Sequence, residues 1–213
     1  MLERLTELLS AIALVALALT ACEPPVRQSA NSALGERQEP VQVVAVTPFA
    51  VAPRLRDQPQ RFGDSSPEAA SRLLVAKVTE TLSRRGVRVV PANDVRLALE
   101  ASGGDMRPPQ VSRIVAEKFG ADALLTGQLT RWAEREGTAA SATRGATVGF
   151  EVVLFDAPGG QRLWSGSFDQ TQLPLSENLL QALRLPGGGT RWLTAEELAH
   201  WGAEQTAQQM PLN

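Results

Sequence analysis

Residues that support catalysis and metal binding are scarce in this sequence. It has a single cysteine, Cys22, a single histidine, His200, and no tyrosine. The usual zinc sites need several His and Cys ligands, so they are excluded. A Ser-His-Asp triad would depend on His200, which falls inside a predicted C-terminal helix, and no G-x-S-x-G motif is present. The sequence therefore predicts a protein that is not an enzyme and that uses no metal or cofactor.

An excess of charge of either sign is also missing. The chain has 21 basic and 23 acidic side chains, which gives a formal net charge of −2 at pH 7. Proteins that bind nucleic acid carry a basic surplus, so no nucleic-acid partner is predicted. The 213 residues are enough for one domain with a core of its own.

One apolar run, Leu8–Ala21, contains no charged residue. It is shorter than the roughly 20 residues of a transmembrane helix, and its length is typical of the apolar core of a secretory signal. It leads into Leu19-Thr20-Ala21-Cys22, which resembles a lipobox, the sequence at which bacterial lipoprotein precursors are acylated on cysteine and cut before it. The alternative is an ordinary buried cysteine at the end of a hydrophobic helix.

The lipobox resemblance implies a signal peptide over residues 1–21, cleavage between Ala21 and Cys22, and acyl chains, palmitate among them, on Cys22. Several acyl chains give stable attachment where a single chain gives marginal binding. The mature protein is then expected at the periplasmic face of the outer membrane. Glu23 resembles the acidic residue that retains lipoproteins in the inner membrane, which leaves that membrane as the alternative.

Residues 22–40 are polar and Pro-rich and show almost no apolar periodicity, which predicts a flexible linker. Fully extended, this segment spans at most about 65 Å. The folded domain is therefore expected to stay close to its membrane.

Strands are predicted where β-branched and alternating apolar residues gather. The last two form a hairpin around the turn Asp156–Gly160, residues 134–145 form a mobile polar loop, and residues 169–175 leave the sheet. The predicted strands are 41–49, 87–90, 123–132, 148–155 and 162–168.

Helices are predicted from apolar stripes bounded by capping residues. Ser66 and Asn93 are the expected caps of two of them, and Thr194 with Glu197 forms a capping-box pattern. The predicted helices are 66–85, 93–101, 109–119, a short one after Ser176, and 195–208.

This order of elements predicts an α/β fold, with a mixed sheet of about five strands and helices packed against it. One domain is expected over residues 41–175, and a C-terminal helical segment, 176–213, packs on or near it. The strand–helix–strand order predicts a parallel pair between 41–49 and 87–90.

A polar and aromatic group near the C-terminus is the candidate partner surface. Polar side chains cluster after the last strand, and two tryptophans flank or lie within the last helix. The candidate residues are Asp169, Gln170, Gln172, Trp192 and Trp201. A ligand-binding protein or hydrolase would instead need a deep pocket holding two or more of Asp57, Asp64, Asp105, Asp156 and Asp169.

Four stretches carry a family resemblance: VQVVAVTPFA, SRRGVRVVPANDV, KFGADALLTGQLTRW and GFEVVLFDAPGGQRLWSGSF. They resemble a bacterial lipoprotein superfamily that includes CsgG-like proteins, penicillin-binding-protein activators of the LpoB type and the N-terminal domain of TolB. The likeness covers about residues 41–168, and it implies the same fold. The C-terminal part resembles an uncharacterised lipoprotein group.

The resemblance implies a non-catalytic accessory or regulatory protein that binds another envelope protein. The loop 134–145 lacks the apolar alternation of a membrane-inserted hairpin, so pore formation is not expected. The linker is too short for the long reach of the LpoB-type activators. A self-associating structural subunit of a secretion or envelope assembly is the second hypothesis.

Overall fold

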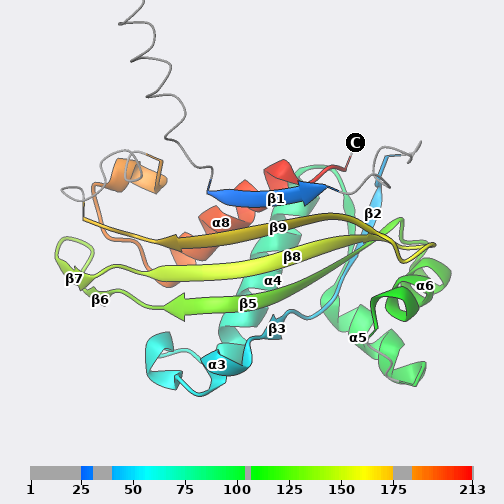
Figure 1. Ribbon diagram of the computed structural model, residues 1–213, viewed down its shortest axis with the longest axis horizontal. Helices are drawn as coiled ribbons and strands as arrows, with labels where there is room; N and C mark the ends of the chain where they lie inside the picture. The colour runs from blue at the N-terminus through cyan, green and yellow to red at the C-terminus, as the bar shows by residue number, and fades with distance from the viewer. Residues whose placement is uncertain (1–24, 31–39, 104–106, 175–183, 213) are drawn as a thin grey trace, which may run out of the picture.

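The computed structural model describes residues 25–30, 40–103, 107–174 and 184–212. Most of them form a mixed sheet with helices packed against it (Figure 1). The strands of the main sheet are β1 (Val26–Ala30), β2 (Val43–Val46), β3 (Ala50–Val51), β4 (Arg88–Val90), β5 (Ala123–Ala133), β8 (Thr147–Asp156) and β9 (Arg162–Thr171). The other elements are α3 (Pro53–Arg56), η1 (Pro59–Phe62), α4 (Pro67–Arg84), α5 (Ala92–Ala101), α6 (Pro108–Phe119), β6 (Glu136–Gly137), β7 (Ala142–Arg144), η2 (Pro186–Gly189) and α8 (Ala195–Gln209).

The strand order in the main sheet is β1-β9-β8-β5-β2-β4, and β3 also pairs with β5. Strand β2 is parallel to β4 and to β5, as the strand–helix–strand order predicts. The pairs β5–β8, β8–β9 and β1–β9 are antiparallel. The α/β prediction with a mixed sheet is therefore confirmed. The predicted number of strands, about five, is too low, because β1 and β3 join the sheet as well.

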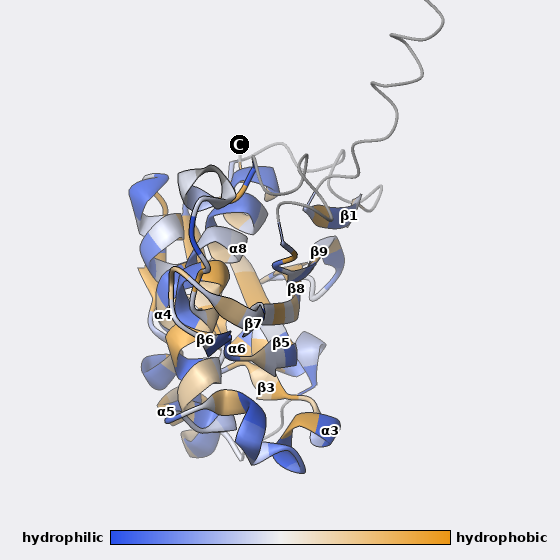
Figure 2. Cartoon of the chain, turned by 90° about the vertical axis from the view of Figure 1, so that its left-hand side faces the viewer, coloured by the Kyte–Doolittle hydropathy of each residue, from blue (hydrophilic) through white to orange (hydrophobic). Residues whose placement is uncertain are grey.

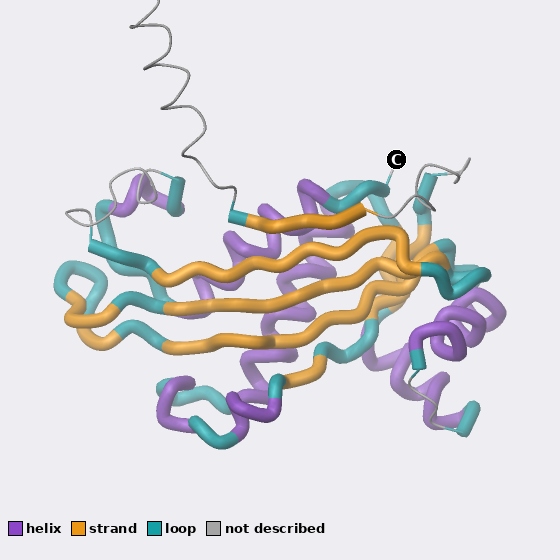
Figure 3. The backbone as a smooth tube through the Cα atoms, viewed as in Figure 1, coloured by secondary structure: helices purple, strands orange, loops and turns teal. Residues whose placement is uncertain are grey.

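Two helical layers cover different parts of the sheet. Helices α4 and α8 pack on one face, where their buried residues join those of β5, β8 and β9 in one large core. The three long strands run side by side with β1 in front of these helices (Figure 3). Helices α5 and α6 cover the opposite face at the end where β2, β4 and β5 begin, around a second core that contains Ala45 and Leu124. Strand β2 is thus buried on both faces.

Helices α4 and α8 form one layer. Helix α8 packs closely on the sheet, and an ion pair connects it to α4. Gly202 of α8 lies against the ring of Phe168, which a Cβ atom would approach to 2.7 Å. Trp201 meets the same ring edge-on at 5.6 Å. Helices α4 and α5 carry hydrophobic and hydrophilic residues on different sides (Figure 2). Arg84 of α4 forms an ion pair with Glu204 of α8 at 3.0 Å.

The helix caps follow the sequence in two of three cases. The Ser66 hydroxyl accepts a hydrogen bond from the Ala69 N–H at 3.1 Å. The Thr194–Glu197 capping box of α8 is complete. Asn93 is the exception: the N-cap of α5 is Pro91, and Asn93 lies inside the helix, where its side chain accepts a hydrogen bond from Arg96. The helix begins at Ala92, directly after Pro91.

The predicted linker over residues 22–40 is wrong for residues 26–30. These residues form β1, which pairs antiparallel with β9 from Val26↔Phe168 to Ala30↔Trp164. Val26 is fully buried in the main core, and the Trp164 indole N–H donates to the Gln28 side chain at 3.1 Å. An edge strand needs one apolar side chain and a ladder of backbone hydrogen bonds, which a polar segment can supply.

Three further boundaries differ from the predictions. The predicted first strand, 41–49, is shorter in the structure, where β2 ends at Val46, and β3 lies in the segment predicted to be a loop after it. Residues 134–145 include β6 and β7, which pair as a small hairpin. Strand β9 continues to Thr171, so Asp169 and Gln170 belong to the sheet rather than to the segment leaving it. The short helix predicted after Ser176 lies outside the described residues.

Candidate functional site

The predicted partner surface is divided by the structure, because two of its five residues are buried. Trp201 is 8% exposed and packs on Phe168 in the core. Gln172 is 4% exposed. The prediction that Trp201 and Gln172 belong to a partner surface is therefore wrong, because both side chains are buried inside the protein.

Gln172 links the sheet to the segment before α8. Its side-chain amide donates to the Arg191 carbonyl at 2.8 Å, and its side-chain carbonyl accepts from the Leu193 N–H at 2.7 Å. These bonds satisfy both ends of a buried amide, as a buried polar side chain requires. Gln172 therefore positions residues 191–193 and is not available to a partner.

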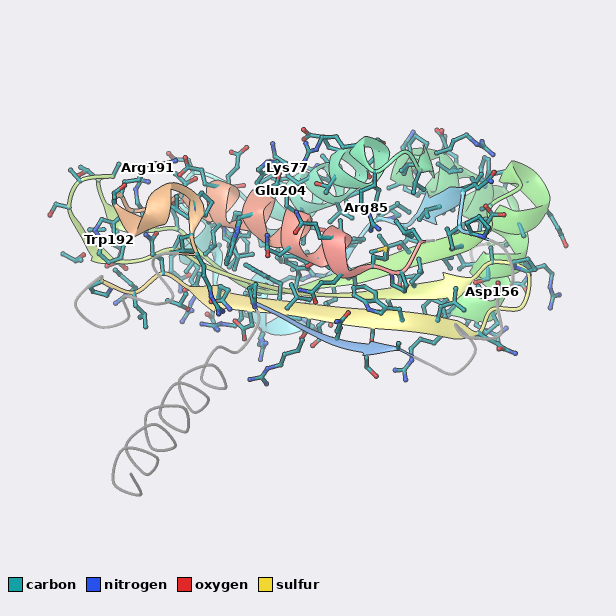
Figure 4. All side chains as sticks on the ribbon, turned by 90° about the horizontal axis from the view of Figure 1, so that it is seen from above. Lys77, Arg85, Asp156, Arg191, Trp192 and Glu204 are labelled. Carbon is teal, nitrogen blue, oxygen red and sulfur yellow. The ribbon has the colours of Figure 1, made fainter. Side chains whose placement is uncertain are left out.

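The other three candidate residues lie nearer the surface. Asp169 is exposed and forms an ion pair with Arg131, which also donates to the Thr171 hydroxyl at 3.1 Å. Gln170 is half-buried in β9. Trp192 is half-buried beside Arg191, at the opposite end of the molecule from Asp156 (Figure 4). The structure thus leaves Asp169, Gln170 and Trp192 as candidates for the predicted surface.

The acidic residues proposed for a hydrolytic site are not gathered together. Asp156 sits at the turn between β8 and β9, where its side chain accepts from the Gly159 N–H at 2.7 Å. Asp169 lies at the other end of the same hairpin, opposite Gly149. Asp57 and Asp64 flank η1, and Asp105 lies outside the described residues. No group of three or more His, Cys, Asp or Glu side chains suited to a metal ion occurs in the described part of the chain.

A different cluster, which the sequence did not indicate, lines a pocket of about 210 Å³ at the end of β5. We call it the arginine pocket. Its lining includes three arginines, from α3, η1 and β5, and no acidic residue. The lining residues are Arg54, Leu55, Gln58, Arg61, Thr130, Arg131, Trp132 and Thr147.

Local structure positions these arginines. Pro53 begins α3, and Arg54 then donates to the Thr130 carbonyl through Nε at 3.3 Å and Nη2 at 3.1 Å. The backbone carbonyl of Arg61 accepts from the Glu134 N–H at 2.9 Å, which ties η1 to the end of β5. A register shift between Leu129 and Arg131 in the β5–β8 pair lies at the same place.

Trp132 forms the buried wall of the arginine pocket. It is 4% exposed and stacks on Phe62 of η1, with ring centroids 6.2 Å apart and ring planes 6° apart. Its indole N–H has no hydrogen-bond partner in the described structure. A buried donor left without an acceptor is uncommon and calls for an explanation.

A second exposed feature is the face of the sheet opposite α4 and α8. Residues alternate in direction along each strand, so the neighbours of the buried Val26, Leu129, Phe150 and Phe168 point to this face. A row of polar residues crosses four adjacent strands here, which we call the open row: Arg27, Ser167, Glu151 and Gln128. Arg27 and Glu151 are exposed, and Ser167 and Gln128 are half-buried.

None of the described helices is both long and apolar enough to cross a membrane, and residues 1–24 lie outside that description. The prediction of an acyl anchor on Cys22 therefore stays a prediction.

No protein-family model matches the sequence, and no curated protein matches it. Among solved structures, lipoprotein GNA1162 from Neisseria meningitidis is similar at 22% identity, over 61% of this chain and 82% of that chain, with a TM-score of 0.42. The C-terminal domain of LpoB from Escherichia coli is similar at 17% identity, over 65% and 90%, with a TM-score of 0.37. Protein XCC0632 from Xanthomonas campestris is similar at 12% identity, over 89% and 90%, with a TM-score of 0.40. The structural neighbours of this chain thus include LpoB, a member of the superfamily that the sequence resembles.

Proposed function

We propose that this chain is a lipid-anchored protein of the bacterial envelope, held at the periplasmic face of the outer membrane, and that it acts without catalysis as an accessory that binds another envelope protein. The observation that carries the proposal is the spacing between Cys22 and the start of the sheet. Val26 is buried in the core, four residues after the cysteine of the lipobox pattern.

This spacing makes the tether far shorter than a linker ending at residue 40. Four residues of extended chain span at most about 14 Å. Strand β1 is fixed by its ladder to β9 and by the Gln28–Trp164 hydrogen bond. An acyl group on Cys22 would therefore hold the sheet against the membrane surface, where a partner must be a membrane neighbour.

The open row supports the partner-binding part of the proposal. It is polar, lies on regular strands and carries both a cation, Arg27, and an anion, Glu151. Complementary charges on a partner would set its orientation rather than supply most of the affinity.

The anchor is tested by fractionating cells that express the full chain or its Cys22→Ala variant. The expected result is wild-type protein in the outer membrane and a variant that is unprocessed or released. If both chains fractionate identically, the lipobox interpretation is wrong and the anchored function falls with it.

Partner binding is tested by purifying the native lipoprotein and, separately, its Glu151→Arg and Glu117→Arg variants, and comparing the proteins that co-purify with each. Glu117 is exposed on α6, away from the open row, so it is a matched control for the same charge reversal. We expect one stoichiometric envelope protein with the wild type and the control, and a yield at least about tenfold lower with Glu151→Arg. Equal capture by both variants would show that the open row is not the interface.

A further inference from the structure

We propose that the arginine pocket binds a phosphate group. Three arginines and Trp132 line a pocket of about 210 Å³ that has no acidic residue in its lining. Guanidinium groups recognise phosphate through paired hydrogen bonds, and their charge does not depend on pH in the physiological range.

Two of the three arginines have donors to offer. Arg61 is exposed, and its guanidinium makes no hydrogen bond or ion pair with any described residue. Arg54 uses Nε and Nη2 on the Thr130 carbonyl, which fixes its side chain and leaves Nη1 for a ligand. An arginine held in this way loses less conformational entropy when it binds an anion.

Trp132 supplies the second, independent observation. Its indole N–H is buried without an acceptor, although the stacking on Phe62 holds the ring in place. We assign an anion bound in the pocket as its acceptor, and because solvent does not reach this nitrogen in the structure, the pocket wall must shift slightly for the two to meet. A carboxylate offers two oxygens, whereas a phosphate offers at least three, so a phosphate group better matches the Arg61 guanidinium, Nη1 of Arg54 and an indole N–H.

The third arginine, Arg131 of β5, is bound by side chains of β9, which lies on the far side of β8. Arg131 forms an ion pair with the exposed Asp169 and a hydrogen bond to Thr171. Asp169 therefore competes with any anion for the Arg131 guanidinium. Removing its charge is expected to tighten anion binding.

The arginine pocket lies at the end of the sheet that also receives the tether. Val26 is paired with Phe168, Phe168 with Phe150, and Phe150 with Leu129, next to the lining residue Thr130. Three strand spacings place Val26 about 15 Å from Leu129. The phosphate group could come from a phospholipid headgroup or from a free phosphate. Only the phospholipid source rests on the anchor of the proposed function.

The test follows the indole N–H signals of the mature lipoprotein in uncharged detergent by ¹H–¹⁵N NMR. The chain has four tryptophans, so Trp164, Trp192 and Trp201 are internal controls, and Trp132→Phe assigns the remaining signal. Inorganic phosphate is titrated at constant ionic strength, because salt alone screens charges. We expect a saturable shift of the Trp132 signal.

Three variants, each of which removes one charge, make the result specific. Arg61→Gln is expected to weaken phosphate binding at least about tenfold. Arg113→Gln, at an exposed arginine of α6, is expected to leave it unchanged. Asp169→Asn is expected to tighten binding severalfold. Equal weakening by Arg61→Gln and Arg113→Gln would overturn the proposal.

A second arm identifies the source of the phosphate. The same protein is placed in micelles doped with phosphatidylglycerol or, as the zwitterionic control, phosphatidylcholine. A Trp132 shift with phosphatidylglycerol but not with inorganic phosphate supports a lipid headgroup, and a shift with inorganic phosphate supports a free phosphate group. No shift in either arm overturns the proposal. Because the inorganic-phosphate arm does not depend on acylation, failure of the anchor leaves that arm interpretable.

Discussion

Glu197 stabilises the start of α8 through two different contacts. Its carboxylate accepts from the Thr194 N–H at 2.9 Å, which completes the capping box. It also receives both Nη groups of Arg191, at 2.8 and 2.7 Å. The hydrogen bonds from Arg191, followed by that from Thr194, outweigh partial burial and lower the Glu197 pKa from 4.5 to about 2.

We predict that Glu197→Gln destabilises the protein at neutral pH by about 1 kcal/mol, a value that allows for solvent screening of a partly exposed pair. A depressed carboxyl pKa stabilises the folded state fully above pH 4.5 and loses that effect as the pH falls toward 2. The wild type should therefore lose stability across this range, and the variant should lose less.

Urea unfolding at several pH values measures both effects. Glu196→Gln is the control, because Glu196 lies in the same first turn but contacts Lys77 only at 4.0 Å. A wild type and Glu197→Gln variant with the same pH dependence between 4.5 and 2 would contradict the assignment.

At the scale of the elements, the sequence predicts the structure best where the residues that determine an element lie within the element itself. The sequence indicates helices α4 and α8 through their capping residues, Ser66 and the Thr194–Glu197 pair. The predicted boundaries of both helices agree with the structure within one residue. The β8–β9 hairpin is equally local, because the turn at Asp156–Gly160 joins its two strands. These elements were predictable because cap, turn and apolar pattern lie within one stretch of chain.

Strand β1 is the opposite case. It contributes one buried side chain, Val26, in a segment of five residues, VRQSA, whose other four are exposed. Its partner lies far along the chain, so no local pattern predicts the pairing. The arginine pocket was missed for a similar reason: its residues come from α3, η1, β5 and β8, and each arginine alone looks like an ordinary surface residue.

We predict that Val26→Asp detaches β1 while the rest of the domain stays folded. A buried, unpaired carboxylate is costly, and releasing β1 avoids that cost while giving up only the pairing with β9. Hydrogen exchange should rise at least about tenfold in residues 26–30 and remain unchanged in β8. The control is Ser29→Asp, which places the same side chain at an exposed position of β1.

At the scale of the whole molecule, the proposed acyl anchor on Cys22 would join the membrane to the sheet through only four residues. Such an anchor would leave the domain almost no freedom to move away from a bilayer. We predict that a 20-residue Gly/Ser spacer inserted after Glu23 raises the mean distance of the domain from the membrane by about 25 Å.

Energy transfer from a dye on Ser165→Cys to an acceptor in the bilayer measures this distance. The label is specific, because Cys22 is the only natural cysteine and is acylated in the proposed mature form. Strong transfer in the wild type and weak transfer with the spacer are expected. Weak transfer in both would mean that β1 does not hold the domain at the surface.

The pairing of β1 with β9 also sets an order of events in folding. Gln28 and Trp164, which join these two strands, are 136 residues apart. Contacts so distant in sequence form slowly, because a long loop must close first. If the chain is exported and anchored as proposed, its N-terminal end emerges first, well before the strand with which it pairs. The sheet is then expected to close last at its membrane side, after the anchor has been attached.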